Sequence, residues 1–367
     1  MKEIVRRVGQ RFMVGFEGLT ASADVKALVR EFGVGHVVLF DRNVEGPEQL
    51  AELVRELQST AREAGLPTPL LVAVDQEGGR VARLKAPWTV WPPPRALGRT
   101  GDEGMARRMG AAVAAELAAC GIRLEFAPVV DVDTNPDNPV IGDRSFGDDP
   151  DLVGRLGAAM VQGLQEGGVA ACAKHFPGHG DTDVDSHLDL PVVSHPRSRL
   201  EEVELPPFRR AIEAGVATVI TSHVLFPELD EDLPASLSLP LTTGLLREDL
   251  GFEGVVVTDD LEMKAVAMRW TPAEIAVKAA KAGADILAFG READGQVAAM
   301  EGLIRAVEAE EIAFSEMEAA EARVRRLQER FLTGYRDPSP TEARLAAGRG
   351  EHRDLAERIA AGSGLPV

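Results

Sequence analysis

Short apolar runs rich in β-branched residues recur along the chain, and each is followed by a stretch with helical spacing. The runs are apolar throughout rather than alternating, which is typical of strands in a parallel sheet covered by helices. Eight strands alternating with helices favour a (β/α)8 barrel, with a doubly wound open sheet as the alternative. The predicted strands are Phe12–Phe16, His36–Phe40, Leu70–Asp75, Leu124–Asp131, Ala170–Lys174, Thr218–Ser222, Val255–Asp259 and Ile286–Phe289.

Polar side chains stand at the carboxyl ends of many of these strands. They are Asp75, Asp131, Lys174, His223 and Asp259. Barrel enzymes draw their chemistry from several strand ends, whereas an open sheet gathers ligands at one switch point. No strand is followed by a G-x-G-x-x-G or Walker A sequence, so nucleotide-binding folds lose their usual support. We therefore expect an α/β fold of the TIM-barrel type.

The helical patterns predict how the barrel is covered and how the chain ends. Residues at helical spacing occupy Pro47–Ala64, Asp102–Ala119, Pro150–Gln165 and Pro272–Ala282. No convincing linker divides the chain before about residue 335, so we expect one catalytic domain over residues 1–335. Two further helices, Ser315–Phe331 and Pro340–Ala361, follow the last strand and are expected to pack outside the barrel. Residues 336–367 form the expected helical tail.

Composition narrows the possible partners. The 367 residues are 45% apolar and 27% charged, and 40 basic against 59 acidic residues give a net charge of −19. This charge makes nucleic acid an improbable partner. No apolar h-region and no stretch of about 18 apolar residues is visible, so neither a secretory signal nor a membrane partner is expected. With only two cysteines, the sequence predicts a cytoplasmic protein without disulfides.

The densest polar segment is K-H-F-P-G-H-G-D-T-D-V-D-S-H, from Lys174 to His187, directly after the fifth strand. Two kinds of chemistry fit it. In one, His175, His179, His187 and aspartates such as Asp185 hold a metal ion. In the other, Asp185 and His187 form a dyad whose carboxylate orients and stabilises an imidazolium. The spacing of the residues does not decide between them.

The same segment resembles the signature of glycoside hydrolase family 3 β-N-acetylglucosaminidases (β-N-acetylhexosaminidases), of the single-domain bacterial NagZ type. The resemblance runs from about Gly15 to about Gly290 and implies a (β/α)8 barrel that removes terminal β-linked N-acetylglucosamine with retention of configuration. Further matching segments are V-D-Q-E-G-G-R-V from Val74, F-A-P-V-V-D-V from Phe126, N-P-V-I-G-D-R-S-F-G from Asn138 and V-T-D-D-L-E-M from Val257.

This resemblance also implies which residues do the chemistry. Asp259 matches the nucleophile, and His187 matches the acid/base, with Asp185 as its partner. Asp260 is then the better candidate for capping the following helix. No metal and no cofactor are implied. The implied sugar-binding residues are Asp75, Arg83, Arg144, Lys174 and His175.

The sequence thus predicts an exo-β-N-acetylglucosaminidase, with muropeptides from peptidoglycan recycling as the expected substrate. Within the same family, a β-N-acetylglucosaminide phosphorylase and a β-glucosidase are the alternatives. From other classes, a metal-dependent barrel hydrolase and a catalytically inactive sugar-binding barrel remain open. The oligomeric state does not follow from the sequence.

Overall fold

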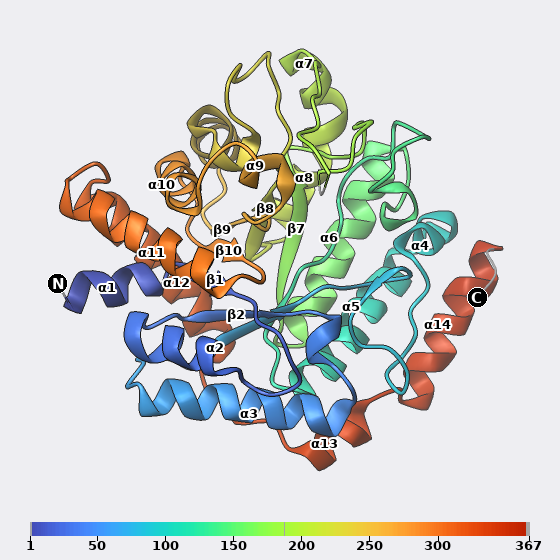
Figure 1. Ribbon diagram of the computed structural model, residues 1–367. Helices are drawn as coiled ribbons and strands as arrows, with labels where there is room; N and C mark the ends of the chain where they lie inside the picture. Colours follow the sequence, from blue (N-terminus) through green and yellow to red (C-terminus); the bar gives the residue numbers. More distant parts are fainter. Residues whose placement is uncertain (1, 187, 365–367) are drawn as a thin grey trace.

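The computed structural model describes residues 2–186 and 188–364, and its centre is a barrel of eight parallel strands (Figure 1). Their order is β10-β1-β2-β3-β6-β7-β8-β9. The barrel closes where β9 meets the start of β10. Val257 forms a bridge to Ile286 there, and the Thr258 N–H donates to the Ile286 carbonyl at 3.0 Å. The strands are β1 (Phe12–Val14), β2 (His36–Leu39), β3 (Leu71–Val74), β6 (Leu124–Glu125), β7 (Ala170–Phe176), β8 (Thr218–Thr221), β9 (Val255–Thr258) and β10 (Leu287–Phe289).

The predicted barrel and its eight strands are therefore confirmed, with one strand much shorter than expected. The fourth strand was predicted over Leu124–Asp131, but β6 ends at Glu125. Pro128 has no N–H to give to a ladder, which interrupts regular pairing there. Backbone bonds to β7 nevertheless continue, because the Ala127 and Pro128 carbonyls accept the N–H groups of Cys172 and Lys174 at 2.8 and 3.2 Å, and Val129 forms a single bridge to Lys174.

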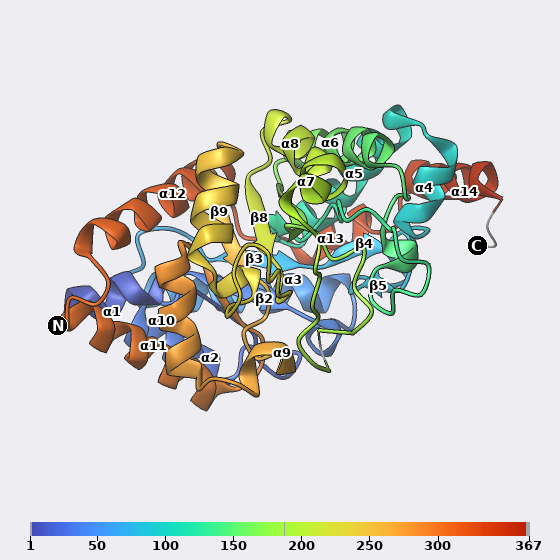
Figure 2. The same cartoon turned by 90° about the horizontal axis from the view of Figure 1, so that it is seen from above.

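Helices surround the barrel, as both views of the molecule show (Figures 1 and 2). The four long helices predicted between strands are present within one residue at each end. Local sequence explains where they begin. Asp102 accepts the Met105 N–H at 2.9 Å, and Thr271 with Glu274 forms a capping box. The helices are α1 (Lys2–Gly9), α2 (Ala23–Ala27), α3 (Pro47–Glu63), α4 (Pro94–Thr100), α5 (Glu103–Ala119), α6 (Pro150–Glu166), α7 (Arg197–Arg199), α8 (Leu205–Glu213), α9 (Lys264–Ala267), α10 (Pro272–Ala282), α11 (Ala293–Glu308), α12 (Phe314–Leu332), α13 (Pro340–Ala346) and α14 (Gly350–Ser363).

One of these helices, α12, closes the amino end of the barrel. Its buried side chains Val324, Leu327 and Phe331 belong to the same apolar cluster as the residues that fill the barrel interior, among them Met13 and Leu71. Burying this face against the strand starts removes apolar surface from water. The opposite, carboxyl end of the barrel is the end where barrel enzymes carry their sites.

The end of the chain folds as two helices where the sequence predicted one over Pro340–Ala361. The helix breaks at Gly348, whose φ of 59° lies in the left-handed region. The two pieces pack against the barrel helices, α13 on α3 and α5, and α14 on α4 and α5. The expected boundary at residue 335 stays a prediction. Among the described helices, none is long and apolar enough to cross a membrane.

Candidate active site

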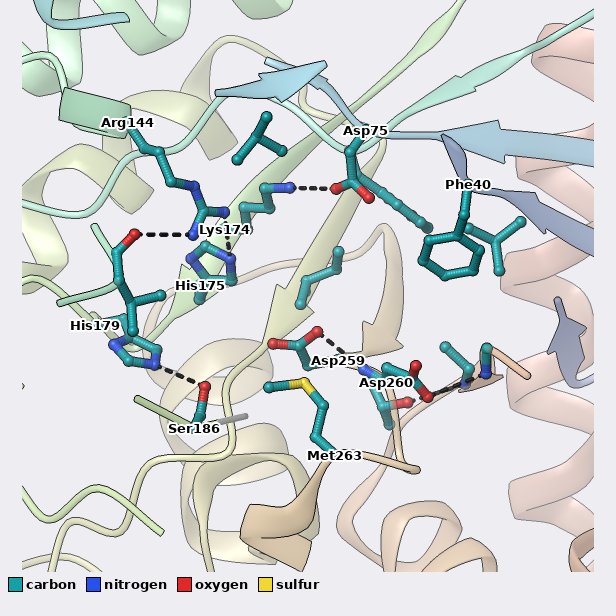
Figure 3. A pocket seen from close by; sticks show the side chains of 18 of the residues that line it. Phe40, Asp75, Arg144, Lys174, His175, His179, Ser186, Asp259, Asp260 and Met263 are labelled. Carbon is teal, nitrogen blue, oxygen red and sulfur yellow. Dashed lines mark hydrogen bonds and ion pairs between the residues drawn. The ribbon is translucent and has the colours of Figure 1, made fainter. Parts of the chain in front are cut away.

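A cavity of about 480 Å³ opens at the carboxyl ends of the strands. Seven of the eight residues predicted to act in catalysis or sugar binding line it, and Figure 3 shows several of them around it. The eighth, His187, lies outside the described residues. The seven are Asp75, Arg83, Arg144, Lys174, His175, Asp185 and Asp259.

A short hairpin places two acidic groups beside the cavity. Strand β3 continues through Asp75 into β4 (Gln76–Gly78), which pairs with β5 (Val81–Ala82). Alternate residues of an extended chain point the same way, so Asp75 and Glu77 share one side. Between them, the side-chain carbonyl of Gln76 accepts the backbone N–H groups of Arg83 and Leu84, both at 2.9 Å. The hairpin is thereby held in register, with Asp75 at the cavity and Glu77 behind its surface.

These two acids anchor a wall of positive charge. The Lys174 ammonium lies 2.7 Å from Asp75 Oδ1 and 2.6 Å from Glu77 Oε1. Arg83 Nη2 is 3.1 Å from Asp75 Oδ2, and the Arg144 fork meets Glu77 at 2.9 and 2.8 Å. Burial alone would raise the pKa of Glu77, but the Arg144 and Lys174 charges outweigh it and lower that pKa to about 2. Glu77 is therefore ionised at neutral pH.

The imidazole of His175 is oriented by groups on both of its nitrogens. Nδ1 lies 2.7 Å from Asp131 Oδ2, and Nε2 lies 3.3 Å from Arg144 Nη2. Because a guanidinium only donates, Nε2 must accept and the proton must sit on Nδ1. Asp131 also accepts the backbone N–H of His179 at 2.7 Å. One buried carboxylate thus fixes both the ring of His175 and the start of the following loop.

A second imidazole, His179, is buried in that loop. Its Nδ1 is 2.8 Å from Thr182 Oγ1 and its Nε2 is 3.2 Å from Ser186 Oγ. Burial lowers the pKa of His179 to about 4, so the ring is neutral at pH 7. Among the residues that the structure describes, no group of three or more histidine, cysteine or acidic side chains could hold a metal ion. The ring nitrogens of His175 and His179 instead have protein partners.

Asp259 follows β9 directly, and its carboxylate faces the cavity across from the charged wall (Figure 3). The Asp259 N–H donates to the Thr221 carbonyl at 3.1 Å, and Asp259 Oδ1 accepts the Asp260 N–H at 2.9 Å. The strand end therefore holds the side chain toward the open space. Asp185 lines the same cavity from the loop after β7.

Asp260 has a different role from the helix cap that we expected. Helix α9 is capped by Met263, and Asp260 Oδ1 instead accepts the N–H groups of Glu262 and Gly290, both at 3.0 Å. This joins the ends of β9 and β10. Burial raises the pKa of Asp260 to about 7.

Glu77 and Asp260 were not predicted to act in the site, and His179 was predicted only as an alternative metal ligand. Asp260 lines the cavity beside Asp259, and Glu77 lies behind Lys174 and Arg144. A signal for Glu77 did exist. It stands two residues after Asp75, which puts both acids on one face of an extended segment. The partners of Glu77 come from β7 and from the segment that follows β6, and no local pattern indicates such distant pairing.

A closed β/α barrel with ionised and imidazole side chains around a cavity at its carboxyl end defines a barrel enzyme. The chain belongs to glycosyl hydrolase family 3, because the model of that family's N-terminal domain matches residues 4–327. The resemblance expected from the sequence is confirmed, and the protein is a glycoside hydrolase.

Relatives extend the similarity over most of the chain. Beta-hexosaminidase A of Pseudoalteromonas piscicida is 38% identical over 284 residues, which are 73% of this chain and 47% of that protein. The chain thus spans about half the length of this curated relative.

Two solved structures are similar in fold as well as in sequence. A glycoside hydrolase family 3 β-N-acetylglucosaminidase from Paenibacillus sp. str. FPU-7 has 43% identity and a TM-score of 0.91, covering 98% of this chain and 68% of its own. NagZ from Neisseria gonorrhoeae, in complex with N-trifluoroacetyl-D-glucosamine, has 30% identity and a TM-score of 0.78, covering 96% and 98%.

Proposed function

We propose that this protein is a retaining exo-β-N-acetylglucosaminidase that removes terminal β-linked N-acetylglucosamine. The observation that carries the proposal is the Asp259 carboxylate at the end of β9, opposite a wall of hydrogen-bond donors across one cavity. A retaining glycosidase needs a carboxylate on one side of the sugar and a proton donor on the leaving-group side. The names of the relatives supply the sugar.

Each residue has a defined part in the proposed reaction. An Asp259 oxygen bonds to the anomeric carbon while the glycosidic C–O bond breaks, and His187 as imidazolium gives its proton to the departing oxygen. In the second step His187 takes a proton from water. The water oxygen bonds to the anomeric carbon, and the bond between that carbon and Asp259 breaks. Asp185 stabilises the imidazolium, which suits proton transfer near neutral pH.

The charged wall would bind and orient the sugar. Lys174 and Arg144 offer charged donors to sugar hydroxyls, and Asp75 offers acceptor oxygens. Hydrogen bonds to charged groups are stronger than neutral ones and fix orientation. Holding the anomeric carbon next to Asp259 positions the two reacting atoms in advance, and such positioning accounts for a large part of an enzyme's rate enhancement. Arg83 and His175 line the same cavity and complete the proposed sugar-binding set.

The proposal also includes a natural substrate and a location in the cell. Muropeptides from peptidoglycan recycling are the proposed natural substrate, and the cytoplasm the proposed location. The substrate rests on the family resemblance of the sequence, and the location rests on its low cysteine content. A defined muropeptide assayed beside a simple aryl glycoside tests the proposed substrate.

The decisive experiment replaces the nucleophile and then rescues it. Asp259→Gly should lose at least about 10³-fold in kcat on an aryl β-N-acetylglucosaminide, because the covalent route is gone. Added azide should restore turnover and yield the α-glycosyl azide, since it attacks from the vacated face. The matched control is Asp189→Asn, an exposed acid on the loop after β7, which should keep wild-type turnover. Undiminished hydrolysis by Asp259→Gly would contradict the proposal.

The same assay separates the alternatives. In phosphate buffer a phosphorylase would form N-acetylglucosamine 1-phosphate in place of free sugar. A β-glucosidase would prefer the aryl β-glucoside. A metal-dependent hydrolase would lose activity on prolonged chelation and regain it with added zinc or manganese.

A further inference from the structure

The buried acid Glu77 is placed to control two of the three cations of the charged wall, Lys174 and Arg144. Only 1% of its side chain is exposed, so it lies behind the cavity surface and cannot touch a sugar. Its Oε1 receives both the Lys174 ammonium at 2.6 Å and Arg144 Nη2 at 2.8 Å, and its Oε2 receives Arg144 Nε at 2.9 Å. One carboxylate therefore sets the positions of both groups that face the substrate.

The donors of Lys174 are almost used up by the protein. An ammonium has three hydrogens. One goes to Asp75 Oδ1 and one to Glu77 Oε1, which leaves a single hydrogen for the cavity. Two fixed acceptors on a tetrahedral nitrogen also fix the direction of the third N–H.

The same count applies to Arg144, which has five N–H groups. Nε and one Nη2 hydrogen go to Glu77, the other Nη2 hydrogen faces His175 Nε2 at 3.3 Å, and Nη1 donates to the Val140 carbonyl at 3.3 Å. One Nη1 hydrogen remains. Lys174 and Arg144 therefore each keep one N–H for the sugar.

Without Glu77 this arrangement could not persist. Lys174 and Arg144 share one carboxylate oxygen, so the two positive charges lie side by side on largely buried side chains. Like charges at such separations repel strongly when they are buried. A neutral residue at position 77 would leave Asp75 as the remaining anchor of Lys174 and would let both cations turn to new acceptors.

The hairpin turn makes Glu77 rigid. Gly78 and Gly79 follow it with φ of 102° and 59°, in the left-handed region that favours glycine. A Cβ on Gly78 would lie 2.5 Å from the Pro92 carbonyl oxygen, and one on Gly79 would lie 2.8 Å from Pro93 Cβ. The Gly79 N–H also donates to the Trp91 carbonyl at 2.9 Å. The turn thus fits closely against the segment before α4.

We propose that Glu77 is a positioning residue that directs one N–H each from Lys174 and Arg144 toward the sugar and so determines which sugar hydroxyl the site requires. This inference rests on the proposed function, since it assumes that a glycoside occupies the cavity. A site with fixed, buried donors rejects a substrate that lacks the matching hydroxyl, because a donor is then left unpaired.

The experiment measures the hydroxyl penalty, which is the fall in kcat/KM when one sugar hydroxyl is removed, with and without the Glu77 side chain. Wild type, Glu77→Gln and Glu77→Asp are assayed on an aryl β-N-acetylglucosaminide and on its 3-, 4- and 6-deoxy analogues. For wild type we expect at least one deoxy substrate to lose about 10- to 100-fold in kcat/KM, as for a hydrogen bond to a charged group. In Glu77→Gln that loss should shrink below about 5-fold, because kcat/KM on the parent sugar falls nearly to the value measured on the deoxy sugar.

Controls separate positioning from mere stability. Glu166→Gln removes an exposed acid paired with Arg107 and should keep every hydroxyl penalty of the wild type. Glu77→Asp keeps the negative charge, but its side chain is one methylene shorter, so the carboxylate lies farther from Lys174 and Arg144. This variant should fold and still lose most of the hydroxyl penalty. Melting temperatures of all variants are measured in parallel.

Three results would overturn the inference. The first is a Glu77→Gln protein that loses the same factor on the parent and on every deoxy sugar. The second is a pair of Glu77 variants that keep the wild-type hydroxyl dependence. The third is a Glu77→Asp protein that does not fold, which would assign the residue to stability alone. Wild type inactive on all four sugars would instead refute the proposed function.

Discussion

At the scale of single residues, Asp259 and Asp260 show how neighbouring carboxyls acquire different properties. Both follow β9, but Asp259 faces the cavity while Asp260 Oδ1 ties β9 to the Gly290 N–H after β10. Burial raises the pKa of Asp260 to about 7 against an ordinary value of 3.8. A proton on Asp260 spares the site a second negative charge beside the proposed nucleophile.

The raised pKa of Asp260 predicts a stability effect with a definite sign. Between about pH 4 and pH 7 the folded carboxyl holds a proton that the unfolded chain releases, so the wild type loses stability as pH rises through this window. Asp260→Asn keeps the acceptor for Glu262 and Gly290 and cannot ionise. Its melting temperature relative to wild type should therefore rise from pH 5 to pH 8. A difference that stays constant across this range would contradict the assignment.

At the scale of elements, the loop after β7 is hydrogen-bonded to the segment that follows β6. Asn138 Nδ2 donates to the His179 carbonyl at 2.9 Å, and Asn135 Nδ2 donates to the Thr182 carbonyl at 3.1 Å. His195 Nε2 lies 2.5 Å from Asp181 Oδ2, which connects the two arms of the loop. The segment that leads to Asp185 therefore depends on the segment that follows β6.

Gly180 provides a test of this dependence. A Cβ there would lie 1.8 Å from the Val132 carbonyl oxygen, so Gly180→Ala must push the two loops apart. We expect at least about a 10²-fold loss in kcat/KM, because the shift carries Asp185 with it. Gly244→Ala is the matched control, since no heavy atom lies within 4 Å of its added Cβ, and it should keep wild-type activity. Equal kinetics for the two variants would show that the loops need no close contact.

Much of this arrangement could be predicted from the sequence, and the rest depends on contacts between distant segments. The strands follow from their apolar runs, since burial on both faces leaves that pattern. The ends of those strands placed Asp75, Lys174 and Asp259 in one site. The role of Glu77 could not be predicted, because its partners Lys174 and Arg144 are 97 and 67 residues away. The break at Gly348 was missed because the apolar spacing continues across it.

At the scale of the whole molecule, the C-terminal helices are joined to the barrel through a buried acid. Glu116 of α5 accepts Thr89 Oγ1 at 2.7 Å, the Gly348 N–H at 3.0 Å and His352 Nδ1 at 3.1 Å. Leu355 and Ile359 of α14 are at most 4% exposed. A chain that ends before α13 would leave Glu116 without two of its partners and would expose the surface that α14 covers.

Deletion of residues 336–367 therefore tests whether the barrel is complete at the boundary after residue 335. Burial of Leu355 and Ile359 alone contributes about 3–6 kcal/mol, so the shortened protein should melt roughly 5–10 °C lower. Leu355→Ala should reproduce part of this loss, whereas Leu345→Ala, at a side chain that is 64% exposed, should not. A shortened protein with unchanged melting temperature and activity would instead establish residues 1–335 as an independent domain. Because α12 remains in that protein, the amino end of the barrel stays closed, and any loss of stability belongs to α13 and α14.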